Sequence, residues 1–151
     1  MSVAFRRDSD EEHLEPRFEI PIPPGPNLVT ARGLELIAAR VAELEALLPA
    51  ITDAEARKAA IRDLRYWRAR LATADLRPVP SGGKVQFGSR VGYRLNGKDG
   101  SIVIVGHDEA DPARGLLSFL APLCRAMLGG EAGDFVDFGG REEAIEIFAI
   151  T

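Results

Sequence analysis

Apolar residues recur at alternating steps of three and four along two stretches of the chain. They are Leu34, Ile37, Val41, Leu44 and Leu48 in the first stretch, and Ala60, Leu64, Trp67, Leu71 and Ala74 in the second. This spacing puts each set on one face of an α-helix. Thr30 is a suitable N-cap for the first helix, and Pro49 makes its continuation costly. The pattern predicts helices of roughly 17 and 22 residues, joined by a tight turn into an antiparallel hairpin.

Beyond the second helix the pattern changes to short strand-like runs. The segment 77–83 holds two prolines, a serine and two glycines, which is typical of a linker. Strand-like runs follow on both sides of Asn96 and Gly97, a pair that is typical of a tight β-hairpin turn. We therefore expect a linker and then a β-hairpin.

The last third of the chain predicts one short helix and two strands. The helix is expected within 121–130, because Pro122 suits a first helical turn and Gly129 suits a helix end. Two final strands are expected to meet at Gly139 and Gly140, since the residues after this pair alternate between the two faces of a strand. Helices and strands thus follow one another without a repeat.

These elements predict an α+β chain in four segments. Residues 1–26 mix charges with a run at 21–26 that holds four prolines in six residues, and these prolines favour an extended arm. The predicted segments are an extended Pro-rich arm at 1–26, a two-helix coiled-coil hairpin at 27–76, a linker at 77–83 and a mixed α and β domain at 84–151.

Composition and charge narrow the function classes. The net charge of −4, from 19 basic and 23 acidic residues, is too small to steer the whole chain toward a polyanion. One cysteine cannot form an internal disulfide, which fits a reducing compartment. No run approaches the roughly 18 apolar residues of a membrane span. We expect a soluble, cytoplasmic protein without membrane contact.

Three segments of the C-terminal half carry a recognisable pattern: "GKVQFGSRV", "IVGHDEAD" and "LLSFLAPLCRAMLGGEAGD". Together they resemble the Gre-factor family of bacterial transcription elongation factors. In the first helix "LVTARGLELI" is similar to the family's opening motif, at Thr30, Gly33 and Ile37. The resemblance covers residues 27–151. It implies that the C-terminal domain has a fold like that of the FK506-binding proteins.

The resemblance also implies a partner, bacterial RNA polymerase, bound at the rim of its secondary channel. The residues that are expected to meet it are Asp108, Glu109, Ser118, Leu120, Ala121, Pro122, Leu123 and Arg125. The alternative is that the apolar members of this set only close the domain core. The effect on transcription and the oligomeric state stay open.

At the hairpin tip the sequence departs from the family. In members of the family that cleave RNA, acidic residues at the tip help to hold a metal ion for cleavage of backtracked RNA. Here Thr52, Asp53 and Glu55 lack the family's surrounding motif, and Thr52 with Glu55 fits a helix capping box. The hairpin is also roughly twenty residues shorter than in cleavage factors. This is about ten residues per helix and shortens its reach by about 15 Å.

We therefore expect a polymerase-binding regulator that is not an enzyme and lacks transcript cleavage, cofactor and metal, as in the short-hairpin Rnk-type members of the family. The alternative is a genuine cleavage factor that uses Asp53 and Glu55. A metal site at His107–Asp111 is disfavoured, because four neighbouring residues of one loop cannot all face one ion without a specific turn. Cys124 is expected to be a small buried residue.

The sequence also has features of two other functional classes, nucleic-acid-binding proteins and prolyl isomerases. The second helix carries a basic set that could give weak nucleic-acid contact or form a solvated face: Arg57, Lys58, Arg62, Arg65, Arg68 and Arg70. On this helix Trp67 is expected in the core and Tyr66 at the surface. An FK506-binding-like fold could also isomerise prolyl bonds, which requires an aromatic-lined pocket. The available aromatic residues are Phe87, Tyr93, Phe119, Phe135, Phe138 and Phe148.

Overall fold

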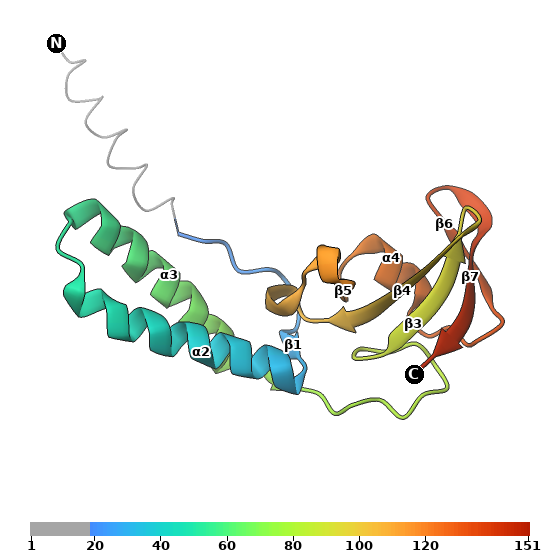
Figure 1. The fold of residues 1–151 in the computed structure, drawn as a ribbon, viewed down its shortest axis with the longest axis horizontal. Helices are drawn as coiled ribbons and strands as arrows, with labels where there is room; N and C mark the ends of the chain where they lie inside the picture. Colours follow the sequence, from blue (N-terminus) through green and yellow to red (C-terminus); the bar gives the residue numbers. More distant parts are fainter. Residues whose placement is uncertain (1–18) are drawn as a thin grey trace, which may run out of the picture. The chain divides into compact units, whose positions relative to one another are not determined.

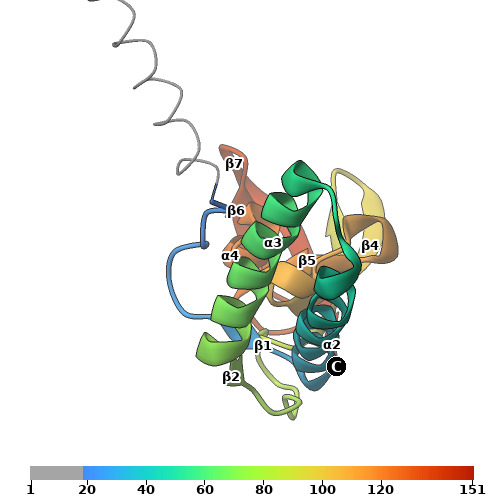
Figure 2. The same ribbon diagram turned by 90° about the vertical axis from the view of Figure 1, so that its left-hand side faces the viewer.

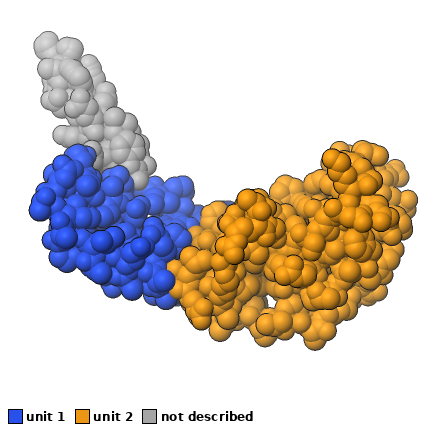
Figure 3. Space-filling model, viewed as in Figure 1, with its two compact units in different colours: residues 1–24, 38–72 blue, residues 25–37, 73–151 orange. Residues whose placement is uncertain are grey.

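The computed structural model describes residues 19–151, which form two compact units by backbone packing (Figure 3). The described part of unit 1 comprises residues 19–24 and 38–72, and unit 2 comprises residues 25–37 and 73–151. Residues 1–18, most of the predicted arm, lie outside the described residues. The boundary between the two units falls inside the first helix, between residues 37 and 38. The four segments predicted from the sequence divide the chain at other positions, and they stay predictions.

Two helices form the predicted hairpin. Helix α2 spans Ala31–Leu47 and helix α3 spans Ala54–Thr73, with the 3-10 turn η2 at Leu48–Ala50 between them. They lie side by side and run in opposite directions (Figures 1 and 2). The lengths of 17 and 20 residues agree with the sequence pattern.

The buried face of α3 is broader than the predicted stripe. Val41, Leu44 and Leu64 form the buried cluster of the hairpin, and Trp67 packs partly against it as expected. Tyr66 was expected at the surface, and this is wrong, because its side chain is only 9% exposed. Its ring meets that of Trp67 edge-on, with 5.1 Å between centroids. The heptad stripe identifies residues that face α2, and Tyr66 is buried next to that stripe.

Unit 2 is built around a five-stranded sheet. Its strands are β3 (Arg90–Leu95), β4 (Lys98–Val105), β5 (Leu116–Ser118), β6 (Phe135–Phe138) and β7 (Arg141–Ile150). They lie in the order β5-β4-β3-β7-β6, and all neighbours are antiparallel except β4 and β5. Asn96 and Gly97 both have positive φ, as the predicted hairpin turn requires. The α+β class is confirmed.

The core of unit 2 lies between this sheet and helix α4, Pro122–Met127. Its buried side chains are Val85, Val91, Ile102, Ile104, Cys124, Met127, Ile145 and Ile147. Cys124 is fully buried, as predicted, and burial raises the pKa of its thiol to about 11. A thiol that stays protonated at neutral pH is a packing group, since the thiolate is the reactive form.

A short ladder that the sequence did not indicate ties the two ends of the hairpin together. Strand β1, Leu28–Val29, pairs in parallel with strand β2, Asp75–Leu76. The Asp75 N–H donates to the Asn27 carbonyl at 2.8 Å, and the Arg77 N–H donates to the Val29 carbonyl at 2.9 Å. The chain that enters α2 is thereby bonded to the chain that leaves α3.

Candidate functional site

The turn between β5 and α4 is fixed by Ser118. Its hydroxyl accepts a hydrogen bond from the Leu120 N–H at 3.1 Å, and its carbonyl accepts one from the Ala121 N–H at 2.9 Å. The next residue, Phe119, donates its N–H to the Val105 carbonyl of β4 at 2.9 Å. Ser118 therefore organises the turn that carries the predicted polymerase-binding residues.

Helix α4 divides those residues into two sets. Ala121 and Leu123 are half-buried and pack against the core. Leu120, Pro122 and Arg125 are exposed, and we call these three the α4 knob. Part of this segment therefore closes the core and part of it presents apolar surface. A polymerase contact at the exposed part stays a prediction.

The acidic loop has an inward-facing carboxylate. Residues His107–Glu109 form the 3-10 turn η3, in which Asp108 is half-buried and Glu109 is only 7% exposed. The Thr30 hydroxyl donates to Glu109 Oε1 at 2.5 Å, and Arg32 Nη1 donates to Glu109 Oε2 at 3.1 Å. A polymerase contact by Asp108 or Glu109 stays a prediction. Within residues 19–151 no three His, Cys, Asp or Glu side chains lie close enough to hold a metal ion.

Two motif segments meet at this carboxylate. The Thr30 hydroxyl also accepts from the Gly33 N–H at 3.0 Å, which confirms Thr30 as the N-cap of α2. A Cβ on Gly33 would lie 2.9 Å from Glu109 Oε1, and a Cβ on Gly106 would lie 2.3 Å from the Leu28 carbonyl oxygen. We call these contacts the clamp, which is formed by Leu28, Thr30, Arg32, Gly33, Gly106 and Glu109. It joins the start of α2 to the loop after β4, all within unit 2.

The tip carboxylates have local partners. The Ala56 N–H donates to Asp53 Oδ2 at 2.9 Å, so Asp53 is the N-cap of α3. The expected capping box, with Thr52 as the cap, is wrong because the helix begins one residue later, at Ala54. Glu55 lies 3.7 Å from Lys58 Nζ.

Replacing the tip cap should weaken the hairpin modestly. We expect Asp53→Ala to lower the free energy of unfolding by about 1 kcal/mol, because the Ala56 N–H loses its acceptor. Glu55→Ala is the matched control and should cost less than about 0.5 kcal/mol, since its exposed pair with Lys58 is weak. Urea unfolding of the two variants measures both. Equal costs would contradict the capping role.

Most of the basic set on α3 is already engaged. Arg65 donates to both carboxylate oxygens of Glu19, at 2.9 and 2.6 Å, and Arg68 pairs with Glu45 at 2.8 Å. The hydrogen bond from Arg65 is the main cause that lowers the pKa of the Glu19 carboxyl, and that bond raises the pKa of Arg65. Arg70 is only 3% exposed. A nucleic acid would have to displace these partners.

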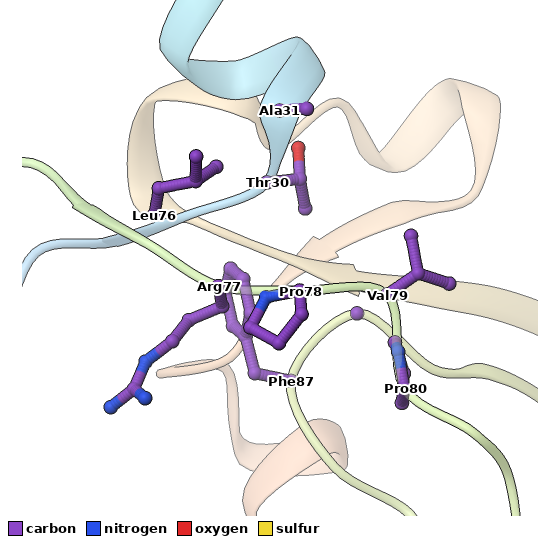
Figure 4. A pocket seen from close by; sticks show the side chains of 9 residues that line it. Thr30, Ala31, Leu76, Arg77, Pro78, Val79, Pro80 and Phe87 are labelled. Carbon is purple, nitrogen blue, oxygen red and sulfur yellow. The ribbon is translucent and has the colours of Figure 1, made fainter.

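One recess in unit 2 has a mostly apolar lining with a single aromatic side chain (Figure 4). It has a volume of about 390 Å³ and is lined by Thr30, Ala31, Leu76, Arg77, Pro78, Val79, Pro80, Phe87 and Gly88. Phe87 is its single aromatic residue, and its ring packs edge-on against Phe119, 5.6 Å between centroids. This recess does not resemble the aromatic-lined pocket that an isomerase requires.

No helix among residues 19–151 combines the length and the apolar character that crossing a membrane requires.

Comparisons with known proteins point to one family. The family model "Transcription elongation factor, GreA/GreB, C-term" matches residues 80–151. The transcription elongation factor GreA of Allorhizobium ampelinum is 36% identical over 114 residues, which cover 73% of this chain and 70% of that protein. GreA of Pseudomonas putida is 40% identical over 81 residues, 52% of this chain and 51% of that protein. The crystal structure of GreA factor homolog 1 of Thermus thermophilus has 20% identity and a TM-score of 0.40, over 84% of this chain and 99% of that chain.

These relatives correct one expectation. The prediction that the protein is not an enzyme is wrong in that plain form, because the relatives from both organisms are named transcription elongation factor GreA. Transcript cleavage, an enzymatic type of activity, belongs to the family that the sequence resembles.

Proposed function

The chain belongs to the GreA/GreB family of transcription elongation factors, and from this we propose that it binds bacterial RNA polymerase through its C-terminal domain, at the rim of the secondary channel. The α4 knob is the contact we assign to this binding, together with the turn that Ser118 organises. A factor of this kind acts in the bacterial cytoplasm.

One observation carries the assignment. Leu120 and Pro122 are exposed apolar residues on a turn whose backbone is fixed by Ser118 and whose helix is anchored by the buried Cys124. Apolar groups held on a rigid support suit an interface anchor, because little conformational entropy is lost on binding. Arg125 beside them supplies the type of charged group that is enriched at such sites.

Binding should depend on the knob. We expect Pro122→Asp to weaken binding to core RNA polymerase about tenfold, since a carboxylate would be desolvated in an apolar contact. Val79→Asp is the matched control, because Val79 is an apolar residue of the same unit that is 91% exposed and lies outside the knob. A titration with labelled protein measures both affinities. An unchanged affinity of Pro122→Asp, or an equal loss in Val79→Asp, would contradict this assignment.

We further infer that the protein does not stimulate transcript cleavage through its tip. The support is that Asp53 caps α3 and that Glu55 pairs with Lys58, so both carboxylates have helix-stabilising roles. A double variant, Asp53→Asn with Glu55→Gln, should give the same cleavage of backtracked RNA as the wild type at saturating protein. Cleavage by the wild type that the double variant loses would overturn this inference and leave polymerase binding intact.

A further inference from the structure

A basic stripe runs along one face of α3. Lys58, Arg62 and Arg65 lie at spacings of four and three residues, which places them on the same side of the helix. Among residues 19–151 Lys58 pairs only with Glu55 of its own helix, at 3.7 Å, and such an exposed pair contributes little to stability. The stripe extends from the middle of α3 toward the hairpin tip over about 10 Å.

The first described residue of the chain already sits on this stripe. Glu19 accepts two hydrogen bonds from Arg65, 46 positions away, and Arg62 also lowers its pKa through its charge. Both residues belong to unit 1. Glu19 is therefore held beside Arg65 and Arg62 of the stripe.

The sequence before Glu19 has the complementary charge. Residues 8–15, "DSDEEHLE", hold five carboxylates and no lysine or arginine. The four residues from Glu15 to Glu19 reach about 13 Å when extended, more than the distance along the helix from Arg65 to Lys58. A short tether raises the effective concentration of such a segment to the millimolar range, so individually weak ion pairs can still form.

We propose that the basic stripe of α3 is an intramolecular binding site for the acidic segment 8–15 of the same chain. The segment continues the contact that Glu19 begins and covers Lys58 and Arg62. A nucleic acid or another acidic partner must displace it to reach this face of the hairpin. The proposal holds whether or not the protein binds RNA polymerase.

Carbodiimide coupling of the full chain tests this contact, because it joins carboxylates only to amines that touch them. The chain has three lysines, at positions 58, 84 and 98, and Lys58 is the one on α3. Peptide mapping should find residues 8–15 coupled to Lys58 with about tenfold higher yield than to the exposed Lys98. The yield should fall several-fold at about 1 M NaCl, where the Debye length is about 3 Å.

Charge reversal provides a matched pair of variants. Arg62→Glu with Arg65→Glu keeps Lys58 but should lower the coupling yield about tenfold, because the segment loses its flanking cations. Arg90→Glu with Arg114→Glu makes the same change in net charge at exposed positions of unit 2 and should leave the yield unchanged.

Three results would overturn the proposal. They are equal coupling of the segment to Lys58 and Lys98, equal loss in both double variants, and coupling only between chains in a mixture of unlabelled and ¹⁵N-labelled protein. The last result would assign the stripe to the acidic segment of a second copy.

Discussion

Gly106→Ala should destabilise the protein by about 3 kcal/mol, the upper range for an overpacked site. The new Cβ would lie 2.3 Å from the Leu28 carbonyl oxygen, well inside van der Waals contact. That oxygen belongs to the backbone of β1, which is held in its ladder with β2. Relief therefore requires moving β1 or the loop after β4, and either movement pulls the clamp apart.

The backbone of Gly106 does not itself need a glycine, which makes the cause testable. Its φ of −78° and ψ of 169° are ordinary for any residue, so the cost comes from the close approach alone. Gly139 is the opposite case, with φ of 62° and no atom within 4 Å of the place that a Cβ would take. We expect Gly139→Ala to cost only about 1 kcal/mol. Urea unfolding of the full chain compares the two, and a Gly106→Ala variant as stable as Gly139→Ala would contradict the steric argument.

The hairpin and the larger strands could be predicted from the sequence because their signals are local. The apolar spacing indicated both helices, and Asn96 with Gly97 marked the β3–β4 turn. Strands β1 and β2 have two residues each, too few for any alternation to be seen. Thr52 and Asp53 are neighbouring residues that can both cap a helix, so only the observed start of α3 decides between them.

The site was predictable in its residues but not in its contacts. Thr30 and Gly33 were singled out in one motif, and Gly106 and Glu109 in another, yet nothing in the spacing placed them together. The Thr30–Glu109 bond joins positions 79 residues apart. Glu109 was predicted on the polymerase-facing surface because the family resemblance implied that role. Its burial depends on donors that come from the distant start of α2.

The clamp should depend on the Glu109 carboxylate. Glu109→Ala removes the acceptor of both the Thr30 hydroxyl and the Arg32 guanidinium, and we expect it to lower the free energy of unfolding by about 2 to 3 kcal/mol. Glu109→Gln keeps an oxygen that can accept from Thr30 and should cost only about 1 kcal/mol. Thermal and urea unfolding of the full chain measure the order of the two variants.

The control is the other half of the ion pair. The Arg32 side chain is 50% exposed, so Arg32→Ala removes a solvent-screened contact and should cost about 0.5 kcal/mol. If the three variants follow this order, the buried hydrogen bond to Thr30 is the main contribution of the clamp, and the ion pair adds little. If Arg32→Ala costs as much as Glu109→Ala, the stabilisation comes from the charge pair instead. A Glu109→Ala variant with wild-type stability would contradict this role of the carboxylate and would show that other contacts, such as the β1–β2 ladder, hold the start of α2.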